Sequence, residues 1–383
     1  MNRKLRVLHV IGGGEFGGAE QHILNLLSNL PKDRVDAKVV CFYDSLFAQK
    51  LREAGIAVSA LHQYGRFDWR LYQGLKQEFR DFSPDLIHTH GVKANFVGRL
   101  AARGTGTVLA TTVHSNLRYD YVNPLAYTVA SMMERVTRGW NHHYIAVSAA
   151  LRDILVKEGV SSKKISVIYN GMDLAPFLER PADADERKAA LYQEWGVPVE
   201  AFVFGTVARF VQVKGLSYMI EAFAQLDPAT GTRPNHLVLV GDGPERASLE
   251  ALSASLGVSD RVHFPGFRQD IPDCMRAFDL FVHSSIYEGL GYTIIEAMAS
   301  GIPVIASDVG GVKEMVTHQQ DGLLTPPAKP DLLADAMRHL SIDLSLQEKL
   351  VQEALTKTTR SFTIQQMADD TLTLYTNLIE MKK

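Results

Sequence analysis

The sequence predicts an α/β protein with two doubly wound domains. Short apolar strands alternate with amphipathic helical stretches along the chain, a pattern typical of parallel sheets that helices cover on both faces. The alternation begins again at Phe202. A length of 383 residues exceeds what one hydrophobic core usually organises, so two domains of ordinary size are expected.

The predicted strands form two consecutive sets. The first set comprises residues 7–11, 37–42, 86–89, 108–112 and 144–147, and the second comprises residues 202–207, 236–240, 262–264, 280–283, 303–306 and 322–324. The turn Asn170-Gly171-Met172-Asp173 predicts a boundary between domains of residues 1–170 and 171–363. Ligands bind beyond the carboxyl ends of such strands, so we expect the glycine-rich turns to meet at a cleft between facing domains.

Composition narrows the class of protein. Two cysteines, Cys41 and Cys274, with no Cys/His cluster suggest neither a disulfide scaffold nor a zinc site. Hydrophobic residues make up 46% of the chain, an ordinary share for a globular enzyme, and no stretch reaches the length of a transmembrane helix. The apolar run after Arg6 ends in glycines rather than forming a signal peptide, so a cytoplasmic protein is expected.

Charge is distributed unevenly between the predicted domains. Residues 1–170 hold 22 Lys and Arg against 14 Asp and Glu, whereas the remaining residues hold 18 against 29. A basic first domain predicts an anionic partner, such as a lipid surface or a phosphorylated acceptor. Aromatic and basic stretches at residues 66–72 and 116–140 suit peripheral contact with the inner face of a membrane, although core packing is the commoner explanation for apolar residues at helical spacing. No nucleic-acid partner is predicted.

The first glycine-rich turn lies at residues 12–18, between a strand and a helix. Gly12, Gly14 and Gly17 satisfy GxGxxG, the dinucleotide-binding pattern, which supports an NAD-dependent oxidoreductase as an alternative. That alternative needs an acid after the second strand to bind the ribose, and Asp44 is the nearest candidate. Five glycines in seven positions also fit a loop that approaches a diphosphate.

Two later turns carry candidate phosphate and base contacts. In Gly205 to Gly215, Arg209 offers a planar fork for phosphate oxygens and Lys214 a point charge near a helix start, although loop cations are commonly only surface charges. The loop 265–270 offers backbone groups and an aromatic ring to a base, with Arg268 as a nucleotide-binding candidate. The turn 241–244 is interpreted as structural.

The segment Glu288 to Glu296 is the most informative in the chain. It places two carboxylates around a glycine turn where a strand gives way to a helix. Unpaired N–H groups and the positive end of the helix dipole favour a phosphate or a sugar edge there. Ionised carboxylates only accept hydrogen bonds, so the pair suits a ligand with hydroxyls in two places. The alternative is a helix-dipole glutamate followed by a solvated one.

Taken together, these motifs resemble glycosyltransferase family 4, whose retaining enzymes have the GT-B fold of two Rossmann-like domains. The resemblance covers nearly the whole chain and depends on collinear motifs: Gly17-Gly18-Ala19-Glu20, Asn170 to Asp173, Arg209 with Lys214, Gly241 to Pro244, Glu288 to Glu296, Ala299 to Val304, and Gly310 to Glu314. The family usually has Phe-Gly-Leu-Pro inside the last carboxylate pair. This chain has Leu290-Gly291-Tyr292-Thr293 instead, which affects expected contacts with the donor sugar.

The resemblance implies a role for each matching residue. The second domain would hold the nucleotide-sugar and the first the acceptor, with a final helix over 364–383 crossing back onto the first. Arg209 and Lys214 would contact the diphosphate, Glu296 the ribose and Glu288 the transferred sugar. The remaining implied contacts are the turn Leu290, Gly291 and Tyr292 on sugar or phosphate oxygens, Gly17 and Gly18 near the diphosphate, and His114 near the reacting sugar.

The predicted function is transfer of a hexosyl unit from a nucleoside-diphosphate sugar, expected to be a UDP-sugar, to an envelope glycan or lipid-linked acceptor. Retention of configuration and independence of metal and cofactor are expected, with cationic side chains stabilising the departing diphosphate. Asp183 and Asp185 are interpreted as a solvated helix face rather than a metal site. The alternatives are the oxidoreductase and a catalytically silent sugar-nucleotide binder.

Overall fold

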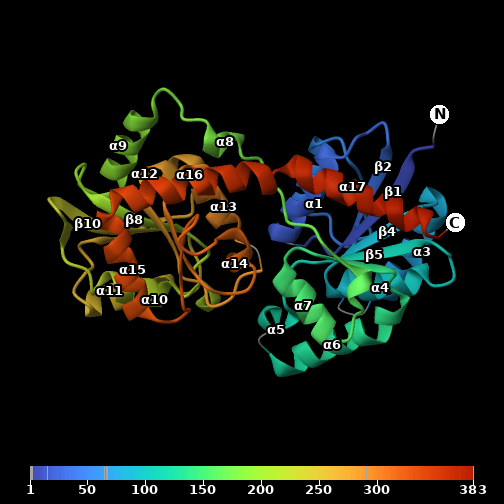
Figure 1. The fold of residues 1–383 in the computed structure, drawn as a ribbon. Helices are drawn as coiled ribbons and strands as arrows, with labels where there is room; N and C mark the ends of the chain where they lie inside the picture. The colour runs from blue at the N-terminus through green and yellow to red at the C-terminus, as the bar shows by residue number, and fades with distance from the viewer. Residues whose placement is uncertain are drawn as a thin grey trace. The chain divides into compact units, whose positions relative to one another are not determined.

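The computed structural model describes residues 3–382 apart from residues 15, 64, 66, 67, 122 and 290. It forms two compact units, one of Met1–Met172 with Thr363–Lys383 and the other of Asp173–Phe362. Each is a parallel sheet with helices on both faces, which confirms the predicted α/β architecture (Figure 1). The first unit ends at residue 172, against the predicted 170, and the last helix belongs to that unit.

The first unit contains a sheet of seven parallel strands in the order β3-β2-β1-β4-β5-β6-β7. In chain order they are β1 (Leu5–Ile11), β2 (Val35–Cys41), β3 (Ala57–Ala60), β4 (Leu86–His90), β5 (Val108–Val113), β6 (His143–Ala146) and β7 (Ile165–Val167). Strand β1 pairs with β2 on one side and with β4 on the other, so the strand order reverses at β1. Ligands of doubly wound sheets bind beyond strand ends at such a point.

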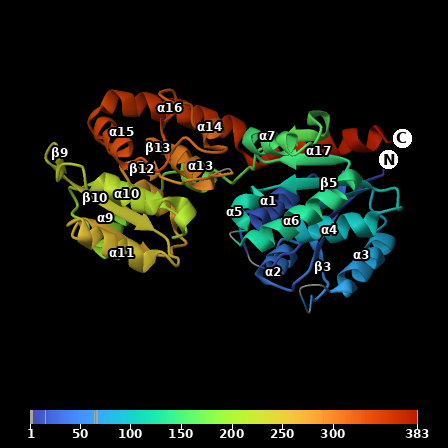
Figure 2. The ribbon, with the colours of Figure 1, turned by 90° about the horizontal axis from the view of Figure 1, so that it is seen from below.

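Helices cover both faces of this sheet (Figure 2). Alternate residues of β1 show the two faces: Val7 and Ile11 pack with α1 and α17, whereas Leu8 and Val10 pack with α3 and α4. The helices of the unit are α1 (Gly18–Asn29), α2 (Leu46–Glu53), α3 (Trp69–Phe82), α4 (Val92–Ala102), α5 (Leu117–Asp120), α6 (Pro124–Thr137), α7 (Ala149–Lys157) and α17 (Ile364–Glu380).

The second unit has parallel strands in the order β11-β10-β8-β12-β13-β14, and short β9 pairs antiparallel with β10. The strands are β8 (Phe202–Val207), β9 (Ala229–Thr230), β10 (Arg233–Val240), β11 (Val262–Gly266), β12 (Leu280–His283), β13 (Val304–Ser307) and β14 (Leu323–Thr325). The helices are α8 (Ala175–Leu178), α9 (Ala184–Trp195), α10 (Leu216–Phe223), α11 (Arg246–Ser255), α12 (Ile271–Ala277), α13 (Tyr292–Ala299), α14 (Val312–Met315), α15 (Pro330–Ile342) and α16 (Leu344–Ser361).

Every predicted strand overlaps a strand of the structure, while β3, β7 and β9 were not predicted. These three are edge or near-edge strands whose residues are mostly exposed or half-buried, so they form no buried apolar run for a sequence pattern to indicate. The first helix begins at Gly18, at the end of the predicted glycine-rich turn 12–18, because Glu20 completes the cap by accepting a hydrogen bond from the Gly17 N–H at 3.1 Å.

Candidate functional site

Several predicted site residues of the second unit follow carboxyl ends of neighbouring parallel strands. Arg209 and Lys214 follow β8, Arg268 follows β11, and Glu288 follows β12. Because these strands are parallel, their carboxyl ends share one edge of the sheet. The structure therefore gathers these predicted groups along that edge.

The loops after β8 and β12 are joined to each other by their backbones. The Ile286 N–H donates to the Val213 carbonyl at 2.8 Å, and the Ser284 hydroxyl donates to the Lys214 carbonyl at 3.0 Å. Gly215 has φ +60°, and a Cβ there would lie 2.3 Å from the Ser284 carbonyl oxygen. Only glycine permits this approach without displacing a loop, so the relative position of the two loops is fixed.

These loops bring Lys214 and Glu288 into an ion pair. The ammonium Nζ lies 2.5 Å from Glu288 Oε2, and Nε2 of buried His283 lies 3.3 Å from the same oxygen. Burial by itself would raise the pKa of the Glu288 carboxyl, but the hydrogen bond from His283 and the charge of Lys214 outweigh burial and lower that pKa to about 2. Glu288 is therefore an ionised, acceptor-only group near neutral pH.

Glu296 lies in the opposite electrostatic environment. It projects from the middle of α13, and burial alone raises the pKa of its carboxyl to about 7. Among the residues that the structure describes, no cation pairs with this carboxylate. Within one motif, the surroundings of Glu288 thus stabilise its ionised carboxylate, whereas those of Glu296 destabilise it.

Arg209 is exposed, and the described part of the chain gives its guanidinium no ion pair. The turn 241–244 supports its loop, since the Phe210 N–H donates to the Asp242 carbonyl at 2.8 Å. A Cβ on Gly241, where φ is +137°, would lie 1.9 Å from the Ala208 carbonyl oxygen. The structural interpretation of this turn agrees with these contacts, and Arg209 keeps an unneutralised charge.

The residues predicted to contact the nucleotide base differ in whether their side chains already have partners. Arg268 forms a bidentate pair with Asp270 at 2.7 and 2.8 Å and a contact with Glu194 at 2.5 Å, whereas the neighbouring Phe267 side chain is 77% exposed. Gly291 is the N-cap of α13 and Tyr292 its first residue. Leu290 lies outside the described residues.

In the first unit, a cavity of about 380 Å³ opens beside the carboxyl ends of β1, β4 and β5. Its lining includes Gly12, Gly13, His90 and the predicted His114. The glycine-rich turn ends at α1, where Gly17 is the N-cap and Gly18 the first residue; both are exposed.

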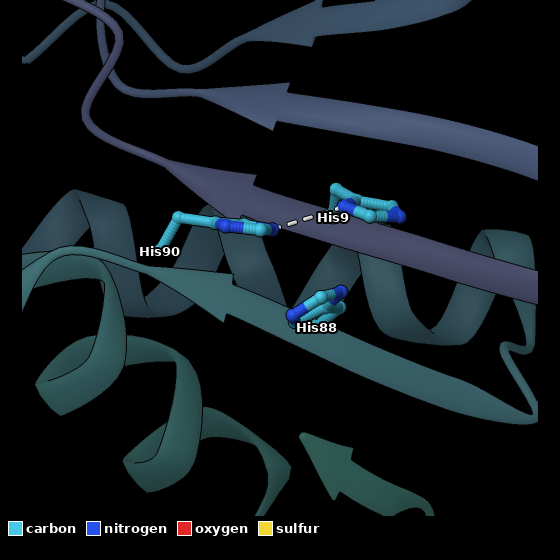
Figure 3. A group of neighbouring side chains, drawn as sticks. All are labelled: His9, His88 and His90. Carbon is cyan, nitrogen blue, oxygen red and sulfur yellow. Dashed lines mark hydrogen bonds between the residues drawn. The ribbon is translucent and has the colours of Figure 1, made fainter. Parts of the chain in front are cut away.

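His114 belongs to a buried histidine cluster that sequence reasoning missed. His9 on β1 and His88 and His90 on β4 face the same side of the sheet, as Figure 3 shows, and His22 projects from α1. Burial lowers the pKa of His9 to about 3, that of His22 to about 4, and those of the other three rings well below the usual range. All five imidazoles are therefore neutral near pH 7.

The aspartates considered for the oxidoreductase alternative and for a metal site each form an ion pair with an arginine. Asp44 pairs with Arg52 at 2.8 Å. Asp183 precedes α9 and pairs with Arg187 at 2.9 Å, and Asp185, 87% exposed, pairs with Arg180 at 2.6 Å. Such contacts are typical of solvated helix faces.

Comparison with known proteins gives the class of the fold and site. Residues 16–176 match the family described as Glycosyltransferase Family 4, and residues 188–357 match Glycosyl transferases group 1. The 2-deoxystreptamine glucosyltransferase of Streptomyces kanamyceticus is 30% identical over 69% of this chain and 70% of its own length. The Escherichia coli UDP-Gal:alpha-D-GlcNAc-diphosphoundecaprenol alpha-1,3-galactosyltransferase is 26% identical over 99% of this chain and 98% of its own.

Among solved structures, Anabaena Alr3699/HepE in complex with UDP has a TM-score of 0.84 and 28% identity, covering 97% of this chain and all of that one. The same protein in complex with UDP-glucose has a TM-score of 0.81 and 29% identity, with coverage of 96% and 99%. Fold, motifs and relatives thus define a glycosyltransferase with GT-B architecture. The chain belongs to glycosyltransferase family 4.

The comparisons confirm the predicted family and do not favour the oxidoreductase alternative. Within the described part of the chain, no helix is both long and apolar enough to cross a membrane.

Proposed function

We propose that this glycosyltransferase moves a hexosyl unit from a UDP-sugar to an envelope glycan or lipid-linked acceptor, with retention of anomeric configuration and without a metal or other cofactor. The observation that carries the proposal is the joined pair of loops holding Lys214 against ionised Glu288, with Arg209 unneutralised at the same sheet edge. The names of the relatives, which include a galactosyltransferase with a UDP-Gal donor and a structure with bound UDP-glucose, support the donor class.

The two cations would stabilise the diphosphate as the sugar leaves. Arg209 offers a planar fork of donors, and Lys214 adds a point charge that already lies in a fixed position. Cationic groups held in place in this way stabilise developing negative charge without reorganising during the reaction. They would fill the role that a metal ion has in other transferases.

The carboxylates would bind hydroxyls. Glu288, an ionised acceptor 14% exposed, would take hydroxyls of the transferred sugar, and Glu296 those of the ribose. Gly291 and Tyr292 would present backbone N–H groups at the start of α13. For the base, exposed Phe267 is the better candidate, because Arg268 already holds two carboxylates.

The first unit would contribute Gly17 and Gly18 close to the diphosphate and His114 near the reacting sugar. The Gly18 N–H, at the start of the twelve-residue helix α1, would donate to diphosphate oxygens, because the Gly17 N–H already donates to Glu20. The acceptor would bind in this unit, whose residues 1–170 carry an excess of Lys and Arg. Lipid-linked and phosphorylated acceptors are anionic, so this charge favours them.

Helix α6 supports a membrane-facing role for the unit. Leu125, Val129, Met132 and Val136 recur at helical spacing on its surface and are 42% to 73% exposed. A membrane surface suits an apolar stripe on a basic unit. The protein should therefore co-sediment with vesicles of anionic lipid at low salt. Met132→Asp should reduce sedimentation, while Ile342→Asp, at a side chain equally exposed in the second unit, should not; equal effects would contradict this orientation.

A ligand panel tests the donor and separates the alternatives. UDP, GDP, ADP and NAD are each added in a thermal-shift assay, where a ligand at 100 times its Kd adds about 2.7 kcal/mol to stability. We expect the largest shift with UDP. Stabilisation by NAD alone would contradict the proposal and support the oxidoreductase.

Turnover distinguishes an enzyme from a silent sugar-nucleotide binder. UDP-glucose and UDP-galactose are incubated with a diphosphoundecaprenol-linked sugar, and the anomeric configuration of the product is read by NMR. A product of inverted configuration, or loss of activity in EDTA that is restored by a divalent ion, would contradict the mechanism. UDP binding without turnover of any acceptor would support the silent binder.

A further inference from the structure

Six buried or half-buried side chains of the first unit form one unbranched series of hydrogen bonds. It begins at Thr112, whose Oγ1 lies 2.7 Å from His88 Nε2, and continues from His88 Nδ1 to the Tyr375 hydroxyl at 2.6 Å. Tyr375 contacts His9 Nε2 at 3.5 Å, and His9 Nδ1 contacts His90 Nε2 at 3.0 Å. The series ends where His90 Nδ1 meets His114 Nε2 at 3.1 Å.

Strand alternation explains why these groups meet. His9 pairs with His88 and Ile11 with His90 in the register of β1 with β4, and His90 pairs with Thr112 on β5. Side chains two positions apart share a face, so the histidines line the face that α17 covers with Tyr375. The series runs from the middle of the sheet to its carboxyl edge, where His114 lines the cavity.

A neutral imidazole has one donor and one acceptor nitrogen, so the four rings align in one direction when the Tyr375 hydroxyl accepts from one neighbouring ring and donates to the other. A hydroxyl that accepted from both rings would leave its own buried proton unpaired. In the first alignment every proton is on Nδ1, Thr112 donates to His88, and the His114 Nδ1–H is unpaired. In the second every proton is on Nε2, and both the Thr112 hydroxyl proton and the His114 Nδ1 lone pair are unpaired. Within the described residues Thr112 Oγ1 has no second partner and His114 Nδ1 has none, so the first alignment leaves fewer buried groups unsatisfied.

We propose that this series holds His114 as its Nδ1–H tautomer, so that its ring offers the cavity a fixed donor for an oxygen atom of a sugar or phosphate ligand. Tyr375, His88 and Thr112 are then positioning residues for His114, although Tyr375 is distant in sequence on the C-terminal helix. The inference rests on the proposed function only for the nature of that ligand.

The geometry also suggests a metal ion, because nitrogens of His9, His88 and His90 lie within 4.8 Å of one another. However, each of these six ring nitrogens already has a hydrogen-bond partner in the series, as the His9–His90 contact in Figure 3 illustrates. A metal would have to displace these contacts, since only an unshared lone pair can ligate. The hydrogen-bonded series accounts for the same residues without one.

Imidazole 15N chemical shifts in the ligand-free protein test the tautomers directly. We expect His9, His88, His90 and His114 all to be Nδ1–H. Tyr375→Phe removes the hydroxyl that joins the two halves, so His88 should keep its tautomer through Thr112, while His9, His90 and His114 should become mixtures. A change of tautomer at His114, three hydrogen bonds from Tyr375, with no change at the adjacent His88 is a result that a purely structural role would not give.

Tyr192→Phe is the matched control, because Tyr192 is as buried as Tyr375 and donates to the Ala277 carbonyl at 2.8 Å in the second unit. It should leave all four tautomers unchanged. Mixed tautomers in the wild-type protein, an unchanged His114 in Tyr375→Phe, or a stoichiometric metal ion in the purified protein would each overturn the proposal.

With a working transfer assay, Tyr375→Phe should lower kcat by about tenfold, the value of one lost hydrogen bond, with UDP affinity unchanged. An unchanged kcat alongside mixed tautomers would refute the positioning role. Absence of transfer by the wild-type protein would instead count against the proposed function. The tautomer measurement would still show whether the hydrogen-bonded series fixes the tautomer of His114.

Discussion

Replacing either glutamate of the Glu288 to Glu296 motif by glutamine should change stability in opposite directions. The folded pKa of Glu296 is about 7 against an ordinary value of 4.5. The difference of about 2.5 units, at about 1.4 kcal/mol per unit, means that the ionised carboxylate destabilises the fold by about 3 kcal/mol. Glu296→Gln removes this cost and should raise the free energy of unfolding by up to that amount at pH 8.

The sign follows from proton binding. Between pH 4.5 and 7 the folded state keeps the Glu296 proton and the unfolded state has lost it, so wild-type stability falls as pH rises. Above pH 7 the penalty is constant, and below pH 4.5 both states are protonated. The gain in Glu296→Gln should therefore be full at pH 8, smaller at pH 6 and absent near pH 4.5.

Glu288→Gln is the matched comparison within the same motif. Its folded pKa of about 2 lies below 4.5, so its ionised form stabilises the fold by about 3 kcal/mol above pH 4.5, and this contribution is lost as pH falls toward 2. The glutamine variant also leaves Lys214 without its partner. It should be less stable than wild type at pH 7.

Urea unfolding measures both effects in a background where Trp69 and Trp140 are replaced by phenylalanine. Fluorescence then reports Trp195, a buried residue of the second unit, so that unfolding of this unit is followed by itself. Destabilisation by Glu296→Gln at pH 8, or the same stability change at pH 8 and pH 5, would refute the electrostatic reasoning.

Two further predictions concern the cations and the glycines. Arg209→Ala should weaken UDP binding 10- to 100-fold, roughly the value of a charge-assisted hydrogen bond, whereas Arg338→Ala on α15 should not change the Kd measured by calorimetry; equal losses would show a nonspecific effect. Gly310→Ala should impair UDP binding as well as stability, because its Cβ would lie 1.9 Å from the Glu288 carbonyl oxygen. Gly257 also has positive φ, but open space surrounds it, so Gly257→Ala should cost only about 1–2 kcal/mol of stability. Identical behaviour of the two glycine variants in UDP binding would count against a role for the Gly310 contact.

The sequence predicted the fold well because its signals were local. Buried parallel strands such as β8 and β12 are apolar runs, and both were predicted at their observed bounds. The edge strand β7, in which only the first of three residues is buried, lacks such a signal. Helix starts shifted where capping decided the boundary, as at Gly17.

The sequence named candidate site residues, but it could not give the contacts that these residues make. Lys214 and Glu288 lie 74 positions apart, and no periodicity indicates that their side chains form an ion pair. The sequence offers Arg268 as a nucleotide-binding candidate, and the structure pairs its guanidinium with Asp270, a local contact that the spacing of two residues could have suggested. The alternation of His88 and His90 is a signal that could have indicated a shared face, whereas the register that places His9 beside them is not predictable from a local pattern.

The joined loops also explain how one edge of the sheet can carry so much charge without a ligand. The Gly311 N–H donates to the Glu288 carbonyl at 3.0 Å, while backbone contacts from Ser284 and Ile286 hold the Lys214 loop. Because the backbone fixes both charges, a diphosphate that replaces part of the ion pair needs little rearrangement. Glu288 neutralises Lys214 in the ligand-free state, and the same oxygen would become available to sugar hydroxyls as the lysine turns to phosphate. Under the proposed function, the ion pair would be a site held ready for its ligand as well as a contact that stabilises the fold.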